Sequence, residues 1–450
     1  MLRPLLLRIM MLIWTLPLFW QCPFAFFLWY EFAGLERSRY SLYGEAAAER
    51  EAAVFLYCSK MKKETKIMKK FTALMLAMLM VMSLLAGCGA SKPAADASTI
   101  KIGMSGPLTG GAAVYGKAVE AGMKIAVEEI NAAAGDGLKI DFQSQDDEHD
   151  GEKALNAYNN LKDWGMQFFA GAVTTAPCLS IAPTAVEDNI FMMTPSGSSD
   201  KIPMTGNNIF QMCFTDPNQG SSAAELVAAL NMAEKIGIIF DNSDDYSKGL
   251  LNGFKTKAAE LGLNIACETS FTADNKTDLA TQITQCKDAG CDFVFLPFYA
   301  TEASQVLTQA AKIGYEPTFF GCDGMDGVLT IEGFDKSLAE GLVLMTPFNP
   351  DAPETQNFVS KYQAMMNGET PNQFAADGYD VIYAIYNACV ASGVDGTTAP
   401  SDACEMLKSY FAGNEFSGLT GNGMTWDDMG MISKIPAAVV IENGKYVSLG

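Results

Sequence analysis

Residues 99–143 read TIKIGMSGPLTGGAAVYGKAVEAGMKIAVEEINAAAGDGLKIDFQ, and this stretch decides the fold class. Residues 99–105 read as a buried strand, and residues 106–111 form a turn-rich loop. Residues 112–134 then carry apolar side chains at helical spacing. These apolar positions are Val119, Met123, Ala126, Val127 and Ile130. Residues 138–143 read as the next strand, so the stretch predicts two strands joined by a helix.

The same alternation continues along the chain. One set of strands and helices lies near 99–215 and a second near 219–345. Residues 354–412 are predicted to be mainly helical, and residues 421–450 to form short strands with turns. Strands separated by helices of this length favour parallel sheets covered on both faces. The sequence therefore predicts an α/β fold with two Rossmann-like lobes, each with a parallel central sheet.

The length and charge limit the classes of protein to consider. A chain of 450 residues is longer than one compact core usually holds, which agrees with two lobes. The formal net charge is −21, and no arginine follows Arg50. A surface this acidic repels nucleic acid, so DNA and RNA are excluded as partners.

The N-terminal part has the features of an export signal. Lysines at 62–70 precede an apolar segment at 71–85, followed by Leu85-Ala86-Gly87-Cys88. This stretch resembles the bacterial lipobox, whose cysteine receives a diacylglycerol anchor. We interpret 61–87 as a lipoprotein signal peptide and 88–98 as a lipidated linker. The alternative is a second transmembrane helix with a chance cysteine.

Residues 1–60 conflict with an N-terminal signal at residue 61. Residues 4–32 are very apolar, although Arg8 and Pro17 interrupt them. We interpret 1–60 as an upstream extension, with translation beginning at Met61 or Met68. A true N-terminal anchor is the alternative.

The sequence offers no apparatus for catalysis. His149 is the only histidine, which removes histidine-based triads and multi-histidine metal sites. The acidic run at 146–150 could coordinate a metal, but we interpret it as a solvated loop. Residues 106–111 do not match a nucleotide-binding loop, and no G-x-S-x-G elbow occurs. We therefore expect no enzyme activity, no cofactor and no metal.

Eight cysteines follow Cys88, and we interpret them as small buried thiols rather than disulfides. They are Cys178, Cys213, Cys267, Cys286, Cys291, Cys322, Cys389 and Cys404.

From about Thr99 to its end, the chain resembles the substrate-binding proteins of branched-chain amino-acid ABC transporters. An ordered set of stretches carries the resemblance. They are IKIGMSGPLTGGAAVYGKAVEAGMKIAVEEINAAAG, FFAGAVTTAPCLSIAP, IFMMTPSGSSDKI, DDYSKGL, DFVFLPFYATEA, FFGCDGMDG and DGYDVIYA. The resemblance implies the type I periplasmic-binding-protein fold, in which three crossing segments join two lobes around a ligand cleft. The crossings would fall near 215–219, 346–350 and 418–428.

The resemblance also implies the extent of each lobe. Residues 99–217 with 347–420 would form the N-terminal lobe. Residues 218–346 with 421–450 would form the C-terminal lobe. Ligand would then lie at the carboxyl ends of the strands.

Carried over residue by residue, the resemblance implies a two-sided ligand site. Thr175 stands where a hydroxyl binds the ligand's α-carboxylate and α-amino groups, and Gly197 and Ser198 stand at a second contact. Asp323 stands where an acidic side chain meets the α-ammonium. The aromatic wall would include Tyr115, Tyr246, Tyr299 and Tyr379. Taken singly, each has a structural alternative: a helix cap for Thr175, a turn for Asp323 and core packing for the tyrosines.

Two features depart from the family. Its frequent disulfide would join the segments at Glu148 and Thr174, and neither residue is cysteine. Phe298 replaces a small residue before Tyr299.

The resemblance implies a monomeric extracytoplasmic protein, anchored to the cell membrane through lipid on Cys88. It would capture an amino acid, branched-chain or otherwise apolar, and deliver it to an ABC permease and ATPase complex. The alternatives are a ligand-sensing module, or a binding protein for an amide, urea or an aromatic acid.

Overall fold

The computed structural model describes residues 96–449. Ala95–Gly450 form one compact unit. The expected upstream extension 1–60, the signal peptide 61–87 and the lipid-bearing Cys88 lie outside the described residues. In the part of the chain that is described, no helix is both long and apolar enough to cross a membrane.

The first sheet is entirely parallel, with its strands in the order β2-β1-β3-β4-β5. The strands are β1 (Thr99–Gly106), β2 (Lys139–Asp146), β3 (Phe168–Phe169), β4 (Phe191–Thr194) and β5 (Ile209–Gln211). β1 and β2 pair from Thr99 opposite Lys139 to Gly106 opposite Asp146. Parallel strands need a crossover between them, and the helix predicted from residues 112–134 supplies it.

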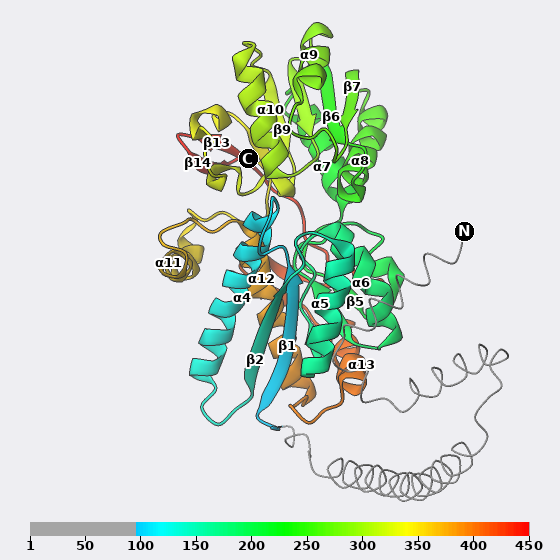
Figure 1. Ribbon diagram of the computed structural model, residues 1–450, viewed down its shortest axis with the longest axis vertical. Coiled ribbons are helices and arrows are strands. Elements are labelled where there is room, and N and C mark those ends of the chain that lie inside the picture. The colour runs from blue at the N-terminus through cyan, green and yellow to red at the C-terminus, as the bar shows by residue number, and fades with distance from the viewer. Residues whose placement is uncertain (1–95, 450) are drawn as a thin grey trace, which may run out of the picture. The chain divides into compact units, whose positions relative to one another are not determined.

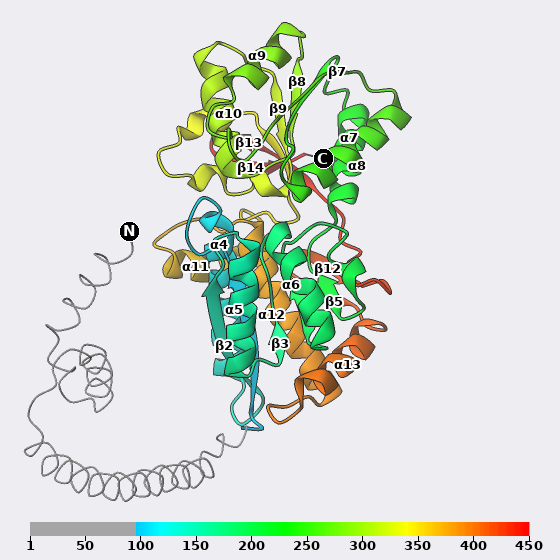
Figure 2. The same cartoon turned by 45° about the vertical axis from the view of Figure 1, so that its right-hand side comes forward.

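Both faces of this sheet are buried. Phe191 and Met193 join one hydrophobic cluster, whereas Met192 between them joins another, as the alternation of a strand requires. α4, α12 and α13 cover the first face, and α5 and α6 cover the second (Figures 1 and 2). The helices are α4 (Ala113–Ala133), α5 (Gly151–Trp164), α6 (Thr175–Glu187), α11 (Gln356–Met365), α12 (Gln373–Ser392) and α13 (Pro400–Phe411). We call this sheet and these helices the first lobe.

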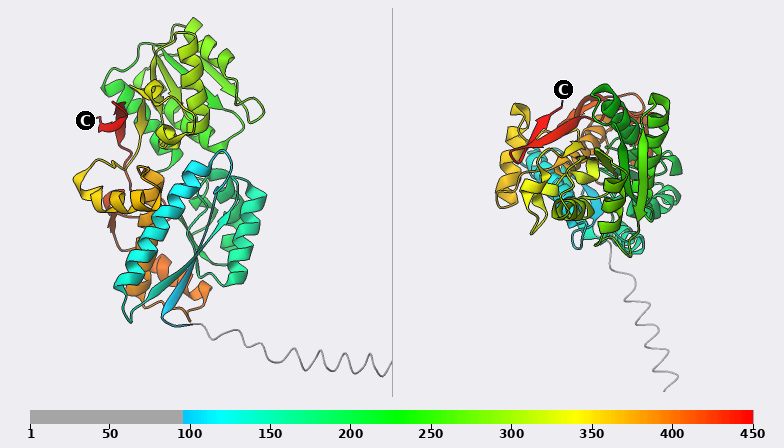
Figure 3. Two further views of the ribbon diagram at one scale, coloured as in Figure 1. Left: turned by 60° about the vertical axis from the view of Figure 1, so that its left-hand side comes forward. Right: turned by 90° about the horizontal axis from the view of Figure 1, so that it is seen from above.

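The late helices α12 and α13 therefore belong with the beginning of the chain. In Figure 3, the orange α12 lies beside the cyan α4, and these two helices share an extensive contact. The contact is close because both helices carry glycine there. A Cβ atom at Gly122 would collide with the carbonyl oxygen of Ala375.

The second sheet has the strand order β14-β13-β10-β9-β8-β6-β7. Its strands are β6 (Ile236–Asp241), β7 (Ile265–Phe271), β8 (Phe293–Leu296), β9 (Thr318–Gly321), β10 (Val343–Met345), β13 (Ala438–Glu442) and β14 (Lys445–Ser448). β6 to β10 are parallel, whereas β13 and β14 join as an antiparallel pair, drawn in red in Figure 3. The prediction of parallel sheets thus holds except at this edge.

Helices cover this second sheet on both faces as well. α7 and α8 pack on the side of Phe293 and Phe295, and α9 and α10 pack on the side of Val294 and Leu296. The helices are α7 (Asp216–Ala229), α8 (Asp245–Leu261), α9 (Ala280–Asp288) and α10 (Ala300–Lys312). We call this sheet and these helices the second lobe.

Short elements complete the described chain. The 3-10 helices are η2 (Pro203–Thr205), η3 (Asp323–Met325), η4 (Val328–Thr330), η5 (Lys336–Ala339) and η6 (Pro353–Thr355). β11 (Phe416–Gly418) and β12 (Gly421–Met424) form an antiparallel hairpin.

Three segments connect the lobes, at 212–215, 346–355 and 433–437. The first ends earlier than expected because α7 begins at Asp216. The Thr215 side chain accepts a hydrogen bond from the Asn218 N–H, and Pro217 occupies the first turn. The T-D-P-N sequence is thus a helix start, and the crossing expected at 215–219 lies mostly inside α7.

The third crossing lies later than the expected 418–428. The Trp426 indole donates to the Gln211 carbonyl at 2.8 Å, and the Gln211 N–H donates to the Gly430 carbonyl at 3.0 Å. These bonds hold residues 421–432 on the first lobe, whereas the sequence assigned them to the C-terminal lobe. Only β13 and β14 from the C-terminal part enter the second sheet.

Candidate functional site

A cavity of about 10 Å³ lies between the lobes. Its lining residues all follow the carboxyl ends of strands or begin helices. They are Val173, Thr174, Thr175, Ser196 and Ser198 after β3 and β4, Tyr115 and Phe374 in the first turns of α4 and α12, and Tyr246, Tyr299, Asp323 and Gly324 in the second lobe. Six of the eight ligand-site residues predicted from the sequence therefore line one cavity.

The first-lobe side presents hydroxyls and a helix start. Thr175 is 2% exposed and is the first residue of α6. Its neighbour Thr174 makes no side-chain cap hydrogen bond within the described chain. Ser198 is 1% exposed and lines the same cavity. Hydroxyls beside the N-terminus of a helix suit an anionic group such as a carboxylate.

Gly197 supports this side without lining the cavity. Its N–H donates to Thr194 Oγ1 at 2.8 Å, and its carbonyl accepts from Gln211 Nε2 at 2.7 Å. A Cβ atom at 197 would approach Cys178 Sγ to 2.5 Å, so a larger residue would disturb the loop. The backbone contact expected at Gly197 is therefore used within the protein.

The second-lobe side presents a buried carboxylate. Asp323 is 3% exposed, and its Oδ1 accepts from the Tyr246 hydroxyl at 2.6 Å and from the Gly324 N–H at 2.8 Å. Burial raises the pKa of Asp323 above its usual value, and the hydrogen bonds from Tyr246 and Gly324 oppose that rise. A cation entering the cavity would be the natural counter-charge for this carboxylate.

Four aromatic rings close the cavity. Tyr246 stacks on Tyr299 with ring centroids 4.9 Å apart. Tyr115 lies 5.4 Å from Tyr299 and packs edge-on against Phe374 at 4.8 Å. The Tyr115 hydroxyl donates to the Gly324 carbonyl at 2.6 Å and accepts from the Ala300 N–H at 2.8 Å. Tyr115 therefore ties α4 of the first lobe to two points of the second lobe.

The structure places Tyr379 away from this cavity. Its hydroxyl donates to Glu129 Oε2 at 2.7 Å, and Lys361 pairs with the same carboxylate. Phe374, five residues earlier on α12, lines the cavity instead. Five residues turn a helix by about 140° beyond one full turn, so the two side chains cannot share one face. Sequence reasoning missed Phe374, because no pattern in the sequence distinguishes it from the other apolar residues of α12.

The acidic run 146–150 is a structured loop rather than a solvated one. Asp146 accepts from the Leu108 N–H at 2.8 Å, and Asp150 caps α5. His149 is hydrogen-bonded through Nδ1 to Thr174 Oγ1 at 2.8 Å, and its ring packs edge-on against Tyr299 at 5.5 Å. Among the described residues, no group of acidic, cysteine or histidine side chains could hold a metal ion. His149 thus joins the two chain segments that a disulfide often joins in the resembled family.

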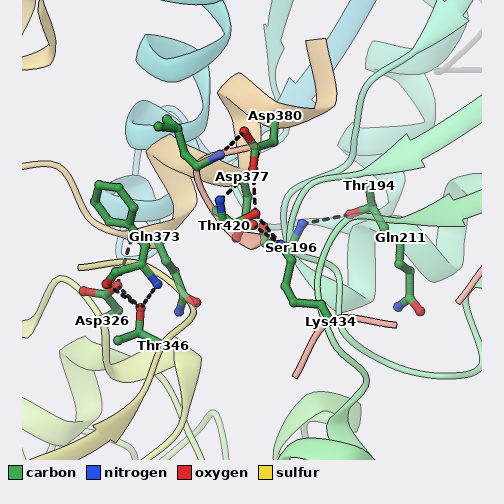
Figure 4. A network of polar contacts seen from close by, with 12 residues as sticks. Thr194, Ser196, Gln211, Asp326, Thr346, Gln373, Asp377, Asp380, Thr420 and Lys434 are labelled. Atoms are coloured by element: carbon green, nitrogen blue, oxygen red, sulfur yellow. Dashed lines mark hydrogen bonds and ion pairs between the residues drawn. The ribbon is translucent and has the colours of Figure 1, made fainter. Parts of the chain in front are cut away.

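A buried polar network lies at the crossings (Figure 4). Lys434, in the third crossing, donates to Asp377 Oδ1 at 2.8 Å and to Thr420 Oγ1 at 2.6 Å. Asp380 accepts from the Thr420 N–H at 2.9 Å. Burial raises the pKa of Asp377 to about 7, although Lys434 opposes that rise.

A second carboxylate of the network joins three segments. Asp326, which follows η3, accepts from the Gln373 N–H at 2.8 Å and from the Tyr446 hydroxyl at 2.8 Å. The Thr346 hydroxyl of the second crossing donates to it at 3.2 Å. The network therefore connects the crossings to both lobes, and no pattern in the sequence had indicated it.

The eight cysteines that the structure describes are free thiols, as expected. Seven are buried and Cys267 is half-buried.

Comparison with known proteins identifies the family. A model described as "Periplasmic binding protein" matches residues 99–445. The chain is 28% identical over 376 residues to the leucine-, isoleucine-, valine-, threonine- and alanine-binding protein of Pseudomonas aeruginosa, covering 82% of this chain and 94% of that protein. It is 26% identical over 353 residues to the Leu/Ile/Val-binding protein of Escherichia coli K12, covering 77% and 92%.

Solved structures agree with this match. The leucine binding protein LivK of Thermotoga maritima is 25% identical with a TM-score of 0.69, covering 78% of this chain and 98% of that one. The branched-chain amino acid transporter substrate binding protein LivJ of Streptococcus pneumoniae, in complex with isoleucine, is 25% identical with a TM-score of 0.70, covering 78% and 100%. These relatives are substrate-binding proteins and not enzymes. This chain belongs to the periplasmic binding protein family.

Proposed function

We propose that this protein captures an α-amino acid between its lobes and delivers it to an ABC permease and ATPase complex. One observation carries the proposal: Asp323 of the second lobe lines the same small cavity as Thr175 and Ser198 of the first. An anion on one side, with hydroxyls and a helix start on the other, matches the two charged ends of a zwitterion.

The electrostatics support a zwitterion over a neutral ligand. An ammonium group that loses its water on burial needs an anionic partner, because an unpaired buried charge costs several kcal/mol. Asp323 would supply that partner. No arginine follows Arg50, so the ligand carboxylate would depend on Thr175, Ser198 and backbone N–H groups.

The similar proteins support an apolar side chain. The names of the relatives from P. aeruginosa and E. coli specify leucine, isoleucine and valine, and the S. pneumoniae structure contains isoleucine. A benzoate-bound protein from R. palustris is 20% identical with a TM-score of 0.69, and this likeness supports the fold alone. Branched-chain and other apolar amino acids are therefore the first candidates.

Screening purified protein that begins at Gly89 tests the ligand class. Ligand that binds only the folded state raises the melting temperature, by an amount set by its concentration relative to its Kd. We expect amino acids to raise it, and we expect simple amides, urea and benzoate to leave it unchanged. A shift with benzoate or an amide but with no amino acid would contradict the proposal.

We also propose that lipid on Cys88 anchors the protein outside the cytoplasm as a monomer, with 61–87 removed as a signal peptide. The support is the order of basic segment, apolar segment, Leu-Ala-Gly-Cys and small polar linker. Cys88→Ser should give an unprocessed or mislocalised precursor, whereas Ser91→Ala in the linker should be processed normally. Normal membrane retention of Cys88→Ser would contradict the anchor. Detection of any peptide from residues 1–60 by mass spectrometry would contradict their assignment as an upstream extension.

A further inference from the structure

The first lobe contains a hydrogen-bonded pair of side chains that the sequence did not assign to the ligand. Thr174 lines the cavity and is 4% exposed. Its Oγ1 lies 2.8 Å from Nδ1 of His149, the only histidine in the chain. We infer that Thr174 binds the carboxylate of the amino acid, and that His149 is a positioning residue that directs the Thr174 hydroxyl proton toward it. This inference rests on the proposed function and adds a carboxylate contact to its site.

The Thr174 hydroxyl is not used to cap its own helix. Thr174 is the N-cap residue of α6, where a threonine oxygen ordinarily accepts a hydrogen bond from a backbone N–H of the first turn. Within the described chain this oxygen makes no such bond and is hydrogen-bonded to His149 instead. A hydroxyl has one proton to donate and two lone pairs that accept. The bond to the imidazole uses only part of this capacity, so Thr174 can also bind a ligand group.

The imidazole determines which way the hydroxyl proton points. If Nδ1 carries a hydrogen, it donates to Oγ1, and the threonine proton is free to point toward a ligand. If Nδ1 carries no hydrogen, the hydroxyl must donate to it, and only lone pairs remain for the ligand. Lone pairs repel a carboxylate, whereas an O–H group donates to it. Binding of a carboxylate at Thr174 therefore selects the tautomer in which Nδ1 of His149 carries the hydrogen.

The imidazole is held in place by the first lobe itself. The His149 N–H donates to Asp147 Oδ1 at 3.0 Å, and the N–H of the fully buried Asp147 donates to the Gly106 carbonyl at 3.0 Å. The backbone at His149 is left-handed, with a φ of 61°, a conformation that histidine adopts more readily than most residues. Because the partners of the pair all belong to the first lobe, opening the cleft breaks no hydrogen bond between them.

The lowered pKa of His149 keeps its imidazole neutral at pH 7.5. Burial lowers this pKa from its ordinary value, the positive charge of Lys276 lowers it further, and Asp150 opposes the change. A neutral imidazole has one N–H, so its tautomer decides whether Thr174 accepts or donates the bond. His149 thus acts by directing the hydroxyl and not by its charge.

Nuclear magnetic resonance tests the tautomer directly, because the chain has a single histidine. Long-range proton–nitrogen spectra of labelled protein that begins at Gly89, purified without a histidine tag, distinguish a hydrogen on Nδ1 from one on Nε2. At pH 7.5 with saturating L-leucine, we expect the hydrogen on Nδ1. A saturated complex with the hydrogen on Nε2 would overturn the role of His149.

Calorimetry with L-leucine tests the contact at Thr174. Thr174→Val keeps the branched shape but removes the hydroxyl, and we expect affinity to fall by about tenfold or more, the scale of one hydrogen bond to a charged group. Thr205→Val is the matched control, because Thr205 is an exposed threonine of the same lobe whose hydroxyl bonds the Lys201 carbonyl. Its affinity should stay within twofold of the wild type.

Two outcomes separate this inference from the proposed function. Wild-type affinity in a folded Thr174→Val protein would overturn the contact and leave the proposed function standing. If the wild type bound none of leucine, isoleucine, valine, threonine and alanine, the inference and the proposed function would both be overturned.

Variants of His149 separate positioning from packing. His149→Asn places an amide N–H near the position of Nδ1 and tolerates the left-handed backbone, so its affinity for L-leucine should stay within threefold of the wild type. His149→Leu has no donor and should lose about as much affinity as Thr174→Val. In the Thr174→Val background, His149→Leu should change affinity less than twofold, because the histidine acts through the hydroxyl. Additive losses in the double variant, or equal affinities of His149→Asn and His149→Leu, would overturn the positioning role.

Discussion

At the scale of single residues, the proposed function makes the charge of Asp323 more important to the site than its shape. Asp323→Asn keeps the size and most of the hydrogen bonding but removes the negative charge that we propose faces a ligand ammonium. We expect binding of the preferred amino acid to weaken by about 2–5 kcal/mol, the usual scale for loss of one partner of a buried charge pair. Isothermal titration calorimetry measures this change directly.

The control for this prediction is Asp288→Asn, because Asp288 is exposed at the end of α9 in the same lobe. That variant should bind like the wild type. Unchanged affinity in Asp323→Asn would mean that residue 323 serves only the turn after β9.

The residues of the cavity differ in how readily the sequence reveals them. The resemblance to the family singled out Thr175, Ser198 and Asp323. All three lie in loops or helix starts that follow strands, and the carboxyl ends of parallel strands meet at one edge, which explains why they line one cavity. The sequence could not show which of Phe374 and Tyr379 lines the cavity. Both lie on α12, and only the packing of that helix decides which of them faces the cavity.

At the scale of elements, the third crossing is held by a buried cation. Lys434 is 3% exposed and lies beside the two buried carboxyls of Asp377 and Asp380. Lys434→Met would leave these carboxyls without a cation, so we expect the free energy of unfolding to fall by about 3–5 kcal/mol. Denaturant titration measures it, and Lys312→Met, at an exposed lysine, should change little.

The loss of unfolding free energy caused by Lys434→Met should depend on pH. The pKa of Asp377 is about 7 in the wild type, above its ordinary value, so its stabilising proton is lost as the pH rises through about 7. Without Lys434 we expect the pKa of Asp377 to rise further, because the cation that favours its charged form is gone. Burying the charged Asp377 carboxylate then destabilises the fold most above pH 7. The loss of unfolding free energy in Lys434→Met should therefore become smaller toward pH 5. A loss independent of pH would contradict the buried-charge explanation.

The contact between α4 and α12 depends on glycine. In Gly122→Ala the new methyl group would collide with the Ala375 carbonyl, and this backbone atom cannot turn aside. We expect a loss of about 1–3 kcal/mol in unfolding free energy, typical of an overpacked core. Gly111→Ala is the control, because a Cβ there meets no atom within 4 Å. Equal stability of the two variants would show that the helices can separate at no cost.

Helices and strands whose apolar residues recur at a regular spacing could be predicted from the sequence, whereas the segments that connect the lobes could not. Helix 112–134 and strand 138–143 correspond closely to α4 and β2 because each has a long apolar face. The crossing at 433–437 has no such face. Its position depends on Trp426 and Gly430 joining the edge of the first sheet, which is a tertiary contact between distant residues.

At the scale of the whole molecule, we expect the three crossings to act as a hinge, so that the cleft opens without ligand and ligand favours the closed state. A ligand between Asp323 and Thr175 touches both lobes only when they are closed, so its differential affinity shifts the population toward closure. Tyr115 adds to the closed state through its bonds to Gly324 and Ala300, which water can replace when the lobes open.

Tyr115→Phe removes both of these bonds and should shift the unliganded protein toward open forms. Each lost bond is worth about 0.5–1.5 kcal/mol, so we expect amino-acid affinity to fall by about 1–3 kcal/mol. Small-angle scattering should show a smaller radius of gyration with ligand in the wild type, and a larger unliganded radius in the variant. Tyr383→Phe is the control, because its hydroxyl bonds Glu129 within the first lobe. If Tyr115→Phe kept the wild-type affinity and radius, the two hydrogen bonds would have no part in closure, and the ligand and hinge alone would set the balance between open and closed forms.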